Sequence, residues 1–147
     1  MNDDTTLRIE RTIAANPAAL FAAWTTPDSM RSWYRDRADD VVEVEQDLRV
    51  GGRYRVTFGP AGAPPYVETG EYLELESPHR IVMTETLATP DGVAWSDTKV
   101  TVTFEAVGTD TRLTLLHERF PSTVERDNAS GGWPGFIDRL ERLTSPA

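Results

Sequence analysis

The chain has 147 residues, 39% of them hydrophobic and 27% charged, which is typical of one soluble globular domain over residues 1–147. Its net charge of −9 at pH 7 argues against nucleic acid and anionic membranes as partners, because both require a basic face. It contains no cysteine, which excludes disulfides, a thiolate nucleophile and a cysteine-ligated metal.

The first ten residues, MNDDTTLRIE, are acidic and polar, whereas a signal peptide begins with a basic stretch followed by an apolar one. No apolar run in the sequence approaches the roughly eighteen residues of a membrane span. We therefore expect a cytoplasmic protein.

The N-terminal part predicts one strand and two short helices. Apolar and polar residues alternate over 7–13, as in a half-buried strand. Asn16-Pro17 and Thr26-Pro27 each place a capping side chain before a proline, which is a helix start. The apolar faces of the two helices are Leu20, Phe21 and Trp24, and then Met30, Trp33 and Tyr34.

From Asp39 onward the hydrophobic period changes to two, the period of strands. Gly51-Gly52, Ser77-Pro78-His79 and Gly108-Thr109-Asp110 are turn-forming sequences between the predicted strands. Strands joined by such short turns must pair antiparallel. The strands are expected around Val42–Leu48 and at Arg53–Phe58, Tyr66–Glu76, Arg80–Leu87, Thr98–Val107 and Arg112–Phe120.

The C-terminal stretch Gly131–Leu143 predicts an amphipathic helix, because its apolar residues recur at spacings of three and four. Proline is tolerated only in the first turn of a helix, so Pro134 predicts that this helix begins near Trp133, after a shorter turn over 122–129. The apolar stripe is Trp133, Phe136, Ile137, Leu140 and Leu143. The fold class is α+β: a curved antiparallel sheet of about six to seven strands wrapped around this helix.

Three polar residues fall in register with the inward-facing apolar positions of the predicted strands. Glu85 continues the phase of Ile81 and Met83, His117 that of Leu113 and Leu115, and Glu71 that of Leu73 and Leu75. Together they would form an acid/base set in a partly apolar pocket. The alternative is that the acids pair with Arg53, Arg55 or Lys99 on neighbouring strands, and a single bulge would invert the phase.

The element order is similar to the helix-grip fold of the START-like superfamily, and more specifically to its bacterial branch related to the activator of the heat-shock protein 90 ATPase. The residues that carry the resemblance include Phe21 and Trp24, Gly51-Gly52-Arg53-Tyr54, Gly70–Leu75 and Gly132-Trp133. The resemblance covers essentially the whole chain. Its motifs are mostly turn glycines and core positions, so they specify the fold better than the function. Members often carry an aromatic residue where this chain has Glu85.

The resemblance implies a cavity between sheet and helix that binds a small hydrophobic or aromatic molecule without a cofactor. Some members of the superfamily use this cavity for cyclase, dehydratase or hydrolase chemistry, and others only bind or carry a ligand. No catalytic residue is transferred by the resemblance. No metal is expected, because the sequence has two histidines and His117-Glu118 lacks the second histidine of a zinc motif.

The expected ligand-binding residues are Trp33, Tyr54, Glu71, Tyr72, Glu85, His117, Trp133 and Phe136. Three function classes stay open. A binding protein predicts a closed apolar cavity with one or two polar anchors. An acid/base enzyme predicts that Glu71, Glu85 or His117 lies within hydrogen-bond reach of another such group. An interaction module, including a possible homodimer, predicts an exposed apolar patch.

Overall fold

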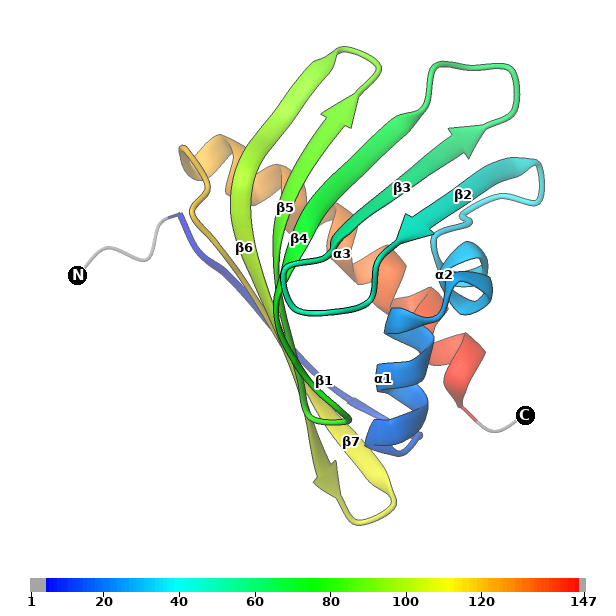
Figure 1. Cartoon of the computed structure of the whole chain (residues 1–147), viewed down its shortest axis with the longest axis vertical. Coiled ribbons are helices and arrows are strands. Elements are labelled where there is room, and N and C mark those ends of the chain that lie inside the picture. The colour runs from blue at the N-terminus through cyan, green and yellow to red at the C-terminus, as the bar shows by residue number, and fades with distance from the viewer. Residues whose placement is uncertain (1–4, 146–147) are drawn as a thin grey trace.

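The computed structural model describes residues 5–145 and has seven strands and three helices (Figure 1). The elements in chain order are β1 (Leu7–Ile13), α1 (Pro17–Thr25), α2 (Pro27–Trp33), β2 (Asp40–Gln46), β3 (Arg53–Pro60), β4 (Tyr66–Glu76), β5 (Arg80–Thr89), β6 (Gly92–Val107), β7 (Asp110–Glu118) and α3 (Thr123–Thr144). The predicted α+β helix-grip architecture is confirmed.

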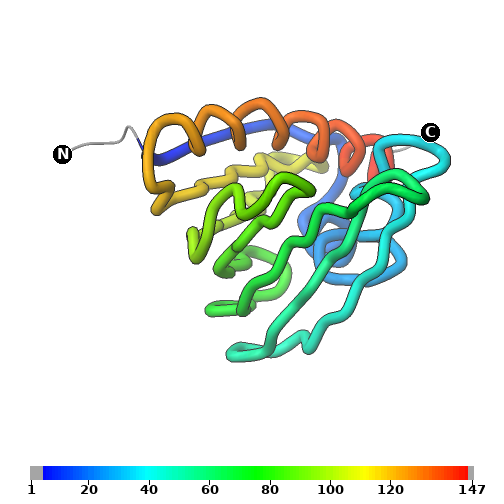
Figure 2. The backbone as a smooth tube through the Cα atoms, turned by 90° about the horizontal axis from the view of Figure 1, so that it is seen from above, coloured from blue at the N-terminus to red at the C-terminus, as the bar shows by residue number. Residues whose placement is uncertain are grey.

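All seven strands form one antiparallel sheet in the order β1-β7-β6-β5-β4-β3-β2. β1 and β2 therefore lie at opposite edges, and α1 and α2 carry the chain from one edge to the other (Figure 1). Seen from above, the sheet curves strongly, and α3 runs alongside β1 (Figure 2). Arg11 of β1 forms ion pairs with Asp138 and Glu141 of α3.

Both short helices begin at the predicted prolines, but the predicted side-chain cap forms only at Asn16, because the Thr26 side chain makes no capping hydrogen bond. The Asn16 side chain accepts a hydrogen bond from the Ala19 N–H at 2.8 Å, and Pro17 occupies the first turn of α1. Thr26 ends α1 and starts α2: its N–H donates to Ala22, and its carbonyl accepts from Met30, both at 2.9 Å. This shared cap fixes the angle between the helices.

The predicted start of the C-terminal helix near Trp133 is wrong, because α3 is continuous from Thr123 to Thr144 and contains Pro134 in its interior. Ser122 caps the helix by accepting the Val124 N–H at 3.2 Å. Buried side chains lie on both sides of the proline and hold the helix in one piece: Ala129, Trp133, Ile137 and Leu140. Leu143, predicted in the apolar stripe, is 43% exposed.

The predicted facing of Glu71 is also wrong. The register between β4 and β5 shifts between Tyr72 and Glu74, which marks a bulge. A bulge inserts one residue and inverts the alternation of side chains beyond it. Tyr72 before the bulge and Leu75 after it both pack in the core, so Glu71 lies on the opposite face of the sheet.

The inward-facing apolar residues of β6 and β7 are buried as predicted, among them Val100, Val102, Phe104, Leu113 and Leu115. Side chains of α1 and α2 cover this end of the concave face. Trp24 packs against Trp33 with ring centroids 4.8 Å apart and against Phe104 at 6.2 Å. The other end of the concave face is left for a cavity.

Candidate functional site

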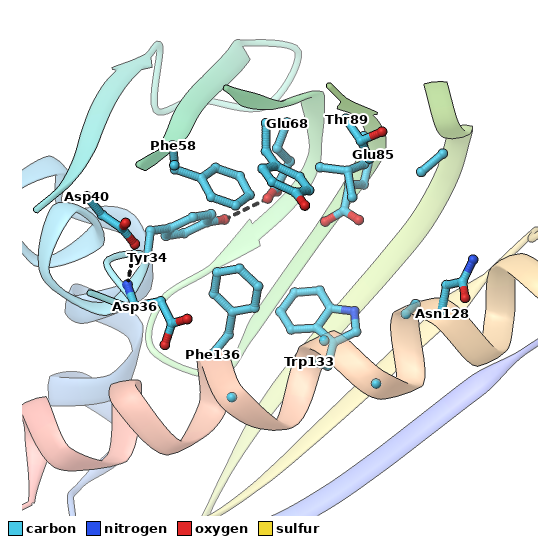
Figure 3. Close-up of a pocket in the computed structure, with 18 of the residues that line it drawn as sticks. Tyr34, Asp36, Asp40, Phe58, Glu68, Glu85, Thr89, Asn128, Trp133 and Phe136 are labelled. Atoms are coloured by element: carbon cyan, nitrogen blue, oxygen red, sulfur yellow. Dashed lines mark hydrogen bonds between the residues drawn. The ribbon is translucent and has the colours of Figure 1, made fainter. Parts of the chain in front are cut away.

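A cavity of about 810 Å³ lies between the concave face of the sheet and the middle of α3 (Figure 3). This volume lies within the range of small-molecule sites in proteins. Six aromatic residues line it, from the end of α2, from β3, β4 and β6, and from α3: Tyr34, Phe58, Tyr66, Trp95, Trp133 and Phe136. The arrangement suits a ligand with flat apolar surfaces.

Three glycines of α3, at positions 131, 132 and 135, form part of the cavity wall. A Cβ atom added at Gly131 or Gly132 would meet no atom within 4 Å, so no close contact requires glycine there. Both residues are exposed at the mouth of the cavity. Their missing side chains leave the mouth wide, at the cost of helix propensity.

Glu68 is the central polar group of the cavity wall and is 5% exposed. Its Oε1 accepts a hydrogen bond from the Tyr34 hydroxyl at 2.9 Å, and its Oε2 accepts one from the Tyr54 hydroxyl at 3.0 Å (Figure 3 shows the first). Burial raises the pKa of Glu68, while these bonds favour its charged form and act in the opposite direction. Burial also raises the pKa values of Tyr34 and Tyr54 well above 10, so both remain donors.

Gly70 makes room for the Tyr54 ring beside Glu68. Tyr54 pairs with Gly70 across β3 and β4, and a Cβ atom on Gly70 would lie 2.5 Å from the Tyr54 ring and 2.0 Å from the Thr84 carbonyl oxygen. Only glycine fits at that position. The glycine lets the Tyr54 hydroxyl reach Glu68 on β4 at 3.0 Å and the Thr84 carbonyl on β5 at 2.9 Å.

Glu85, on the neighbouring strand β5, is 3% exposed and also lines the cavity. The Trp95 indole N–H donates to its Oε1 at 2.9 Å, and its carboxyl lines the same cavity as that of Glu68. Burial, and then the charge of Glu68, raise the pKa of Glu85 well above its usual range. Of the two carboxyls, Glu85 is therefore the one whose protonated form is more strongly favoured.

His117 is fully buried behind the cavity wall, and both of its ring nitrogens are occupied. Nδ1 accepts the Trp133 indole N–H at 3.1 Å, so in the neutral ring the proton is on Nε2. Nε2 donates to the Thr98 hydroxyl at 2.7 Å, which donates in turn to the Glu85 carbonyl at 2.7 Å. Burial lowers the pKa of His117 to about 3.

The nearest carboxyl oxygen to His117 is Oε1 of Glu85, 3.7 Å from Nε2, which is too long for a hydrogen bond. The ring is neutral and has no free lone pair. It therefore positions Trp133 and Thr98, and it is not a base available to a ligand.

The structure brings together three of the eight predicted ligand-binding residues on the cavity surface: Glu85, Trp133 and Phe136. Four lie behind this surface. Tyr54 and His117 are bonded to wall residues, Trp33 packs edge-on against Phe136 at 6.3 Å, and Tyr72 accepts a bond from Gln46 at 2.9 Å. Glu71 borders a separate depression on the opposite face of the sheet.

Sequence reasoning missed Glu68, Tyr34 and Trp95 as wall residues. Glu68 shares its phase with Gly70 and Tyr72, which a bulge separates from Leu75. A phase read backward from Tyr72, through Gly70, would have identified Glu68. Trp95 follows the Pro90-Asp91-Gly92 turn, before the predicted start of its strand, and no pattern pointed to its contact with Glu85.

Four charged residues stand at the rim: Asp36, Arg37, Asp40 and Arg139. The Arg139 guanidinium donates to the Trp33 carbonyl at 2.9 Å and to Asp36 at 3.3 Å, and it lies 4.7 Å from the centre of the Phe136 ring. Asp40 accepts the backbone N–H groups of Asp36 and Arg37, both at 3.0 Å. These contacts order the connection between α2 and β2 over the cavity.

Within residues 5–145, no group of three or more histidine, cysteine, aspartate or glutamate side chains is placed to hold a metal ion. None of the helices in the same part of the chain has the length and apolar character needed to cross a membrane.

Comparisons with known proteins agree with this architecture. The family model described as activator of Hsp90 ATPase homolog 1-like protein matches residues 14–145. A crystal structure of a Chromobacterium violaceum protein is 27% identical, with a TM-score of 0.83, and the match covers 97% of this chain and 99% of that one. No curated protein matches the chain.

Two further solved structures show the same fold. A Mycobacterium smegmatis protein is 19% identical with a TM-score of 0.82, over 99% of this chain and 93% of that one. The solution structure of an AHSA1-like protein from Aeromonas hydrophila is 24% identical with a TM-score of 0.73, over 93% of this chain and 90% of that one.

Proposed function

From the premise that the chain belongs to the family of activator of Hsp90 ATPase homolog 1-like proteins, we propose that it binds a small apolar or aromatic molecule in the cavity between sheet and α3. The family and its fold support a ligand-binding or chaperone-associated module in general. The observation that carries the narrower proposal is the cavity of about 810 Å³ with aromatic walls and two buried carboxyls.

The physical reason is the combination of surfaces in the cavity. The faces of Phe58, Trp133 and Phe136 offer apolar area to be covered, which is the main source of affinity for small ligands. Glu68 and Glu85 supply polar atoms at one place on the wall, which would fix the orientation of a ligand. The site thus combines hydrophobic affinity with a polar anchor.

Tryptophan fluorescence provides the test, because Trp95 and Trp133 line the cavity while Trp24 and Trp33 pack in the core. We expect saturable quenching on titration with one class of aromatic or fatty compounds. The signal should shrink in Trp133→Phe, which removes one reporter from the wall.

A cavity-blocking variant separates binding in the cavity from binding at the surface. Gly132→Leu adds a side chain at the mouth where no atom lies within 4 Å, and it should weaken binding. Ser130→Leu, on the exposed side of the same helix, is the matched control and should bind like the wild type. Equal affinities in both variants, or no response to any compound in a folded protein that self-associates, would favour the interaction module instead.

One observation favours a second candidate, a cofactor-free acid/base enzyme. Glu85 and Glu68 line the same cavity, and the charge of Glu68 contributes to raising the pKa of Glu85, so two acid/base groups converge there, although Glu68 takes the place of the predicted partners. Such a pair would exchange the α-protons of a bound aromatic ketone. Phenylacetone in heavy water, followed by proton NMR, tests this: catalysed exchange that is lost in Glu85→Gln would establish the activity, and exchange at the rate of buffer would exclude it for this probe.

A further inference from the structure

We propose that the ligand of the cavity is a protonated amine with an apolar or aromatic body, and that Glu68 and Glu85 together hold its ammonium group. This inference rests on the proposed function of the cavity and specifies the class of ligand.

The first argument is a buried acidic pair without a counterion. Within residues 5–145, no lysine or arginine forms an ion pair with Glu68 or Glu85. His117, the one basic group near them, is neutral. Buried carboxylates are normally paired or bind cations, since an unpaired charge in an apolar surrounding is strongly unfavourable. Here the unpaired charge faces a cavity of ligand size.

The second argument concerns the cations at the rim. Arg139 is held by the Trp33 carbonyl and by Asp36, and its guanidinium packs near the Phe136 ring. Arg37 is exposed, and Asp36 and Asp40 stand beside it. The charges of the two aspartates and two arginines at the rim cancel. Any net negative charge of the cavity therefore comes from Glu68 and Glu85.

The third argument is the surrounding of the pair. Each oxygen of Glu68 accepts one tyrosine hydroxyl, and a carboxylate oxygen can accept two hydrogen bonds. An ammonium group has three donors to share between the two carboxyls. The rings of Trp95 and Trp133 stand in the same wall, and aromatic faces attract cations in the absence of water.

Binding of the amine has a defined proton balance. In the free protein, burial and the charge of Glu68 favour a proton on Glu85, and the pair then carries one negative charge. When the ammonium group donates hydrogen bonds to both carboxyls, the proton of Glu85 leaves to solvent. One proton is then released for each ammonium bound, and no covalent bond changes. A neutral ligand leaves the proton of Glu85 in place.

The other titratable groups that face the pair do not interfere near neutral pH. Tyr34 from the end of α2 and Tyr54 from β3 stay protonated, because burial raises their pKa values well above 10. Burial raises the pKa of Tyr72 on β4 to about 12, and it lowers that of His117 on β7 to about 3. The remaining charged groups lie at the rim: Asp36, Arg37, Asp40 and Arg139.

Isothermal titration calorimetry tests the proposal with two probes of the same shape, 2-phenylethylamine and 2-phenylethanol. We expect the amine to bind at least about tenfold more tightly than the alcohol at about pH 7 to 8, where the amine is charged. Titrations in phosphate and in Tris, which differ in ionisation enthalpy, should show about one proton released per amine bound and none per alcohol.

The double variant Glu68→Gln/Glu85→Gln keeps the shape of the pair without its acidity. It should lose the preference for the amine and the proton release. Glu76→Gln, an exposed carboxyl on the same strand β4, is the matched control. The number of protons that the wild type releases per bound amine tests the proposal even if the double variant does not fold.

The outcomes separate the two proposals. Binding of the alcohol with equal or greater affinity than the amine, and without proton release, overturns the amine ligand and leaves the cavity function standing. Failure of both probes, together with every compound in the fluorescence panel, overturns both. Amine binding that persists unchanged in the double variant also overturns the inference.

Discussion

Trp133 of α3 donates its indole N–H to Nδ1 of His117 on β7 at 3.1 Å, and this bond joins the cavity wall to the sheet behind it. Through Nε2 the same histidine holds Thr98, which holds the carbonyl of Glu85. The orientation of one wall residue on the helix is thereby tied to that of another on β5. The chain of bonds is complete only while the ring of His117 is neutral.

His117→Gln therefore changes the pH dependence of stability. The pKa of His117 is lowered from 6.5 to about 3, so the unfolded chain binds the extra proton between these values and the folded chain does not. The contribution of His117 to the free energy of unfolding is present above pH 6.5 and is lost as the pH falls toward 3. Relative to the variant, the wild type should lose up to about 1.4 kcal/mol per pH unit in this window.

Urea unfolding at several pH values measures this difference. His79, the second histidine of the chain, lies exposed in the turn between β4 and β5, and His79→Gln is the control. A constant difference between wild type and His117→Gln from pH 6.5 downward would contradict the neutral, fully bonded ring.

Glu85→Gln should change the pH dependence of stability in the direction opposite to His117→Gln. The pKa of Glu85 is raised well above 4.5 in the folded protein by burial and by Glu68, so the folded chain keeps a proton that the unfolded chain loses. This contribution is fully present below pH 4.5 and is lost as the pH rises through the folded pKa, by up to about 1.4 kcal/mol per unit. The wild-type advantage over Glu85→Gln should therefore shrink with rising pH.

The same unfolding series checks this prediction, with Glu76→Gln as the control for losing one exposed carboxyl. Between pH 4.5 and 6.5 the two buried groups act in opposite directions. The wild type should consequently depend on pH less steeply than at least one of the two single variants. Parallel slopes in the two variants would count against this assignment of protons.

Gly131→Ala and Gly132→Ala should each stabilise the protein by about 0.5 to 1 kcal/mol. Both positions lie inside α3, and an added Cβ meets no atom within 4 Å, so the gain in helix propensity is not offset by a clash. Thermal unfolding measures the gain. A destabilisation would show that the backbone at the cavity mouth departs from a regular helix.

Gly70→Ala should be destabilising by about 1 to 3 kcal/mol, as for other overpacked sites. The new Cβ would lie 2.0 Å from the Thr84 carbonyl oxygen and 2.5 Å from the Tyr54 ring. Since the Thr84 oxygen belongs to the backbone, Tyr54→Leu should not rescue the variant. Full rescue in the double variant would mean that the tyrosine ring is the only obstacle.

The sequence predicted most of the fold because its signals are local. Turn sequences such as Gly108-Thr109-Asp110 and alternation within strands gave the antiparallel sheet, and the phases of Glu85 and His117 correctly placed both on the inward face. The facing of a side chain follows from the strand period of two alone, so it is predicted correctly wherever a strand has no bulge.

The errors arose where nonlocal packing overrides a local rule. The bulge after Tyr72 turned Glu71 outward and hid the phase of Glu68, and no residue pattern marks its position. Pro134 did not start a helix, because buried contacts on both of its sides hold α3 continuous. The pairing of Glu68 with Glu85 depends on the neighbouring positions of β4 and β5, which only the three-dimensional register supplies.

The edge position of β1 has a consequence for how the protein folds. Leu7 of β1 pairs with His117 of β7. β1 can therefore pair with β7 only after the strands between them in the sequence have been synthesised. Contacts so distant in sequence slow folding, because a long loop must close before they form. During synthesis the β2–β6 meander would emerge with its apolar face uncovered, and this nascent stage is when the chain is most exposed to aggregation.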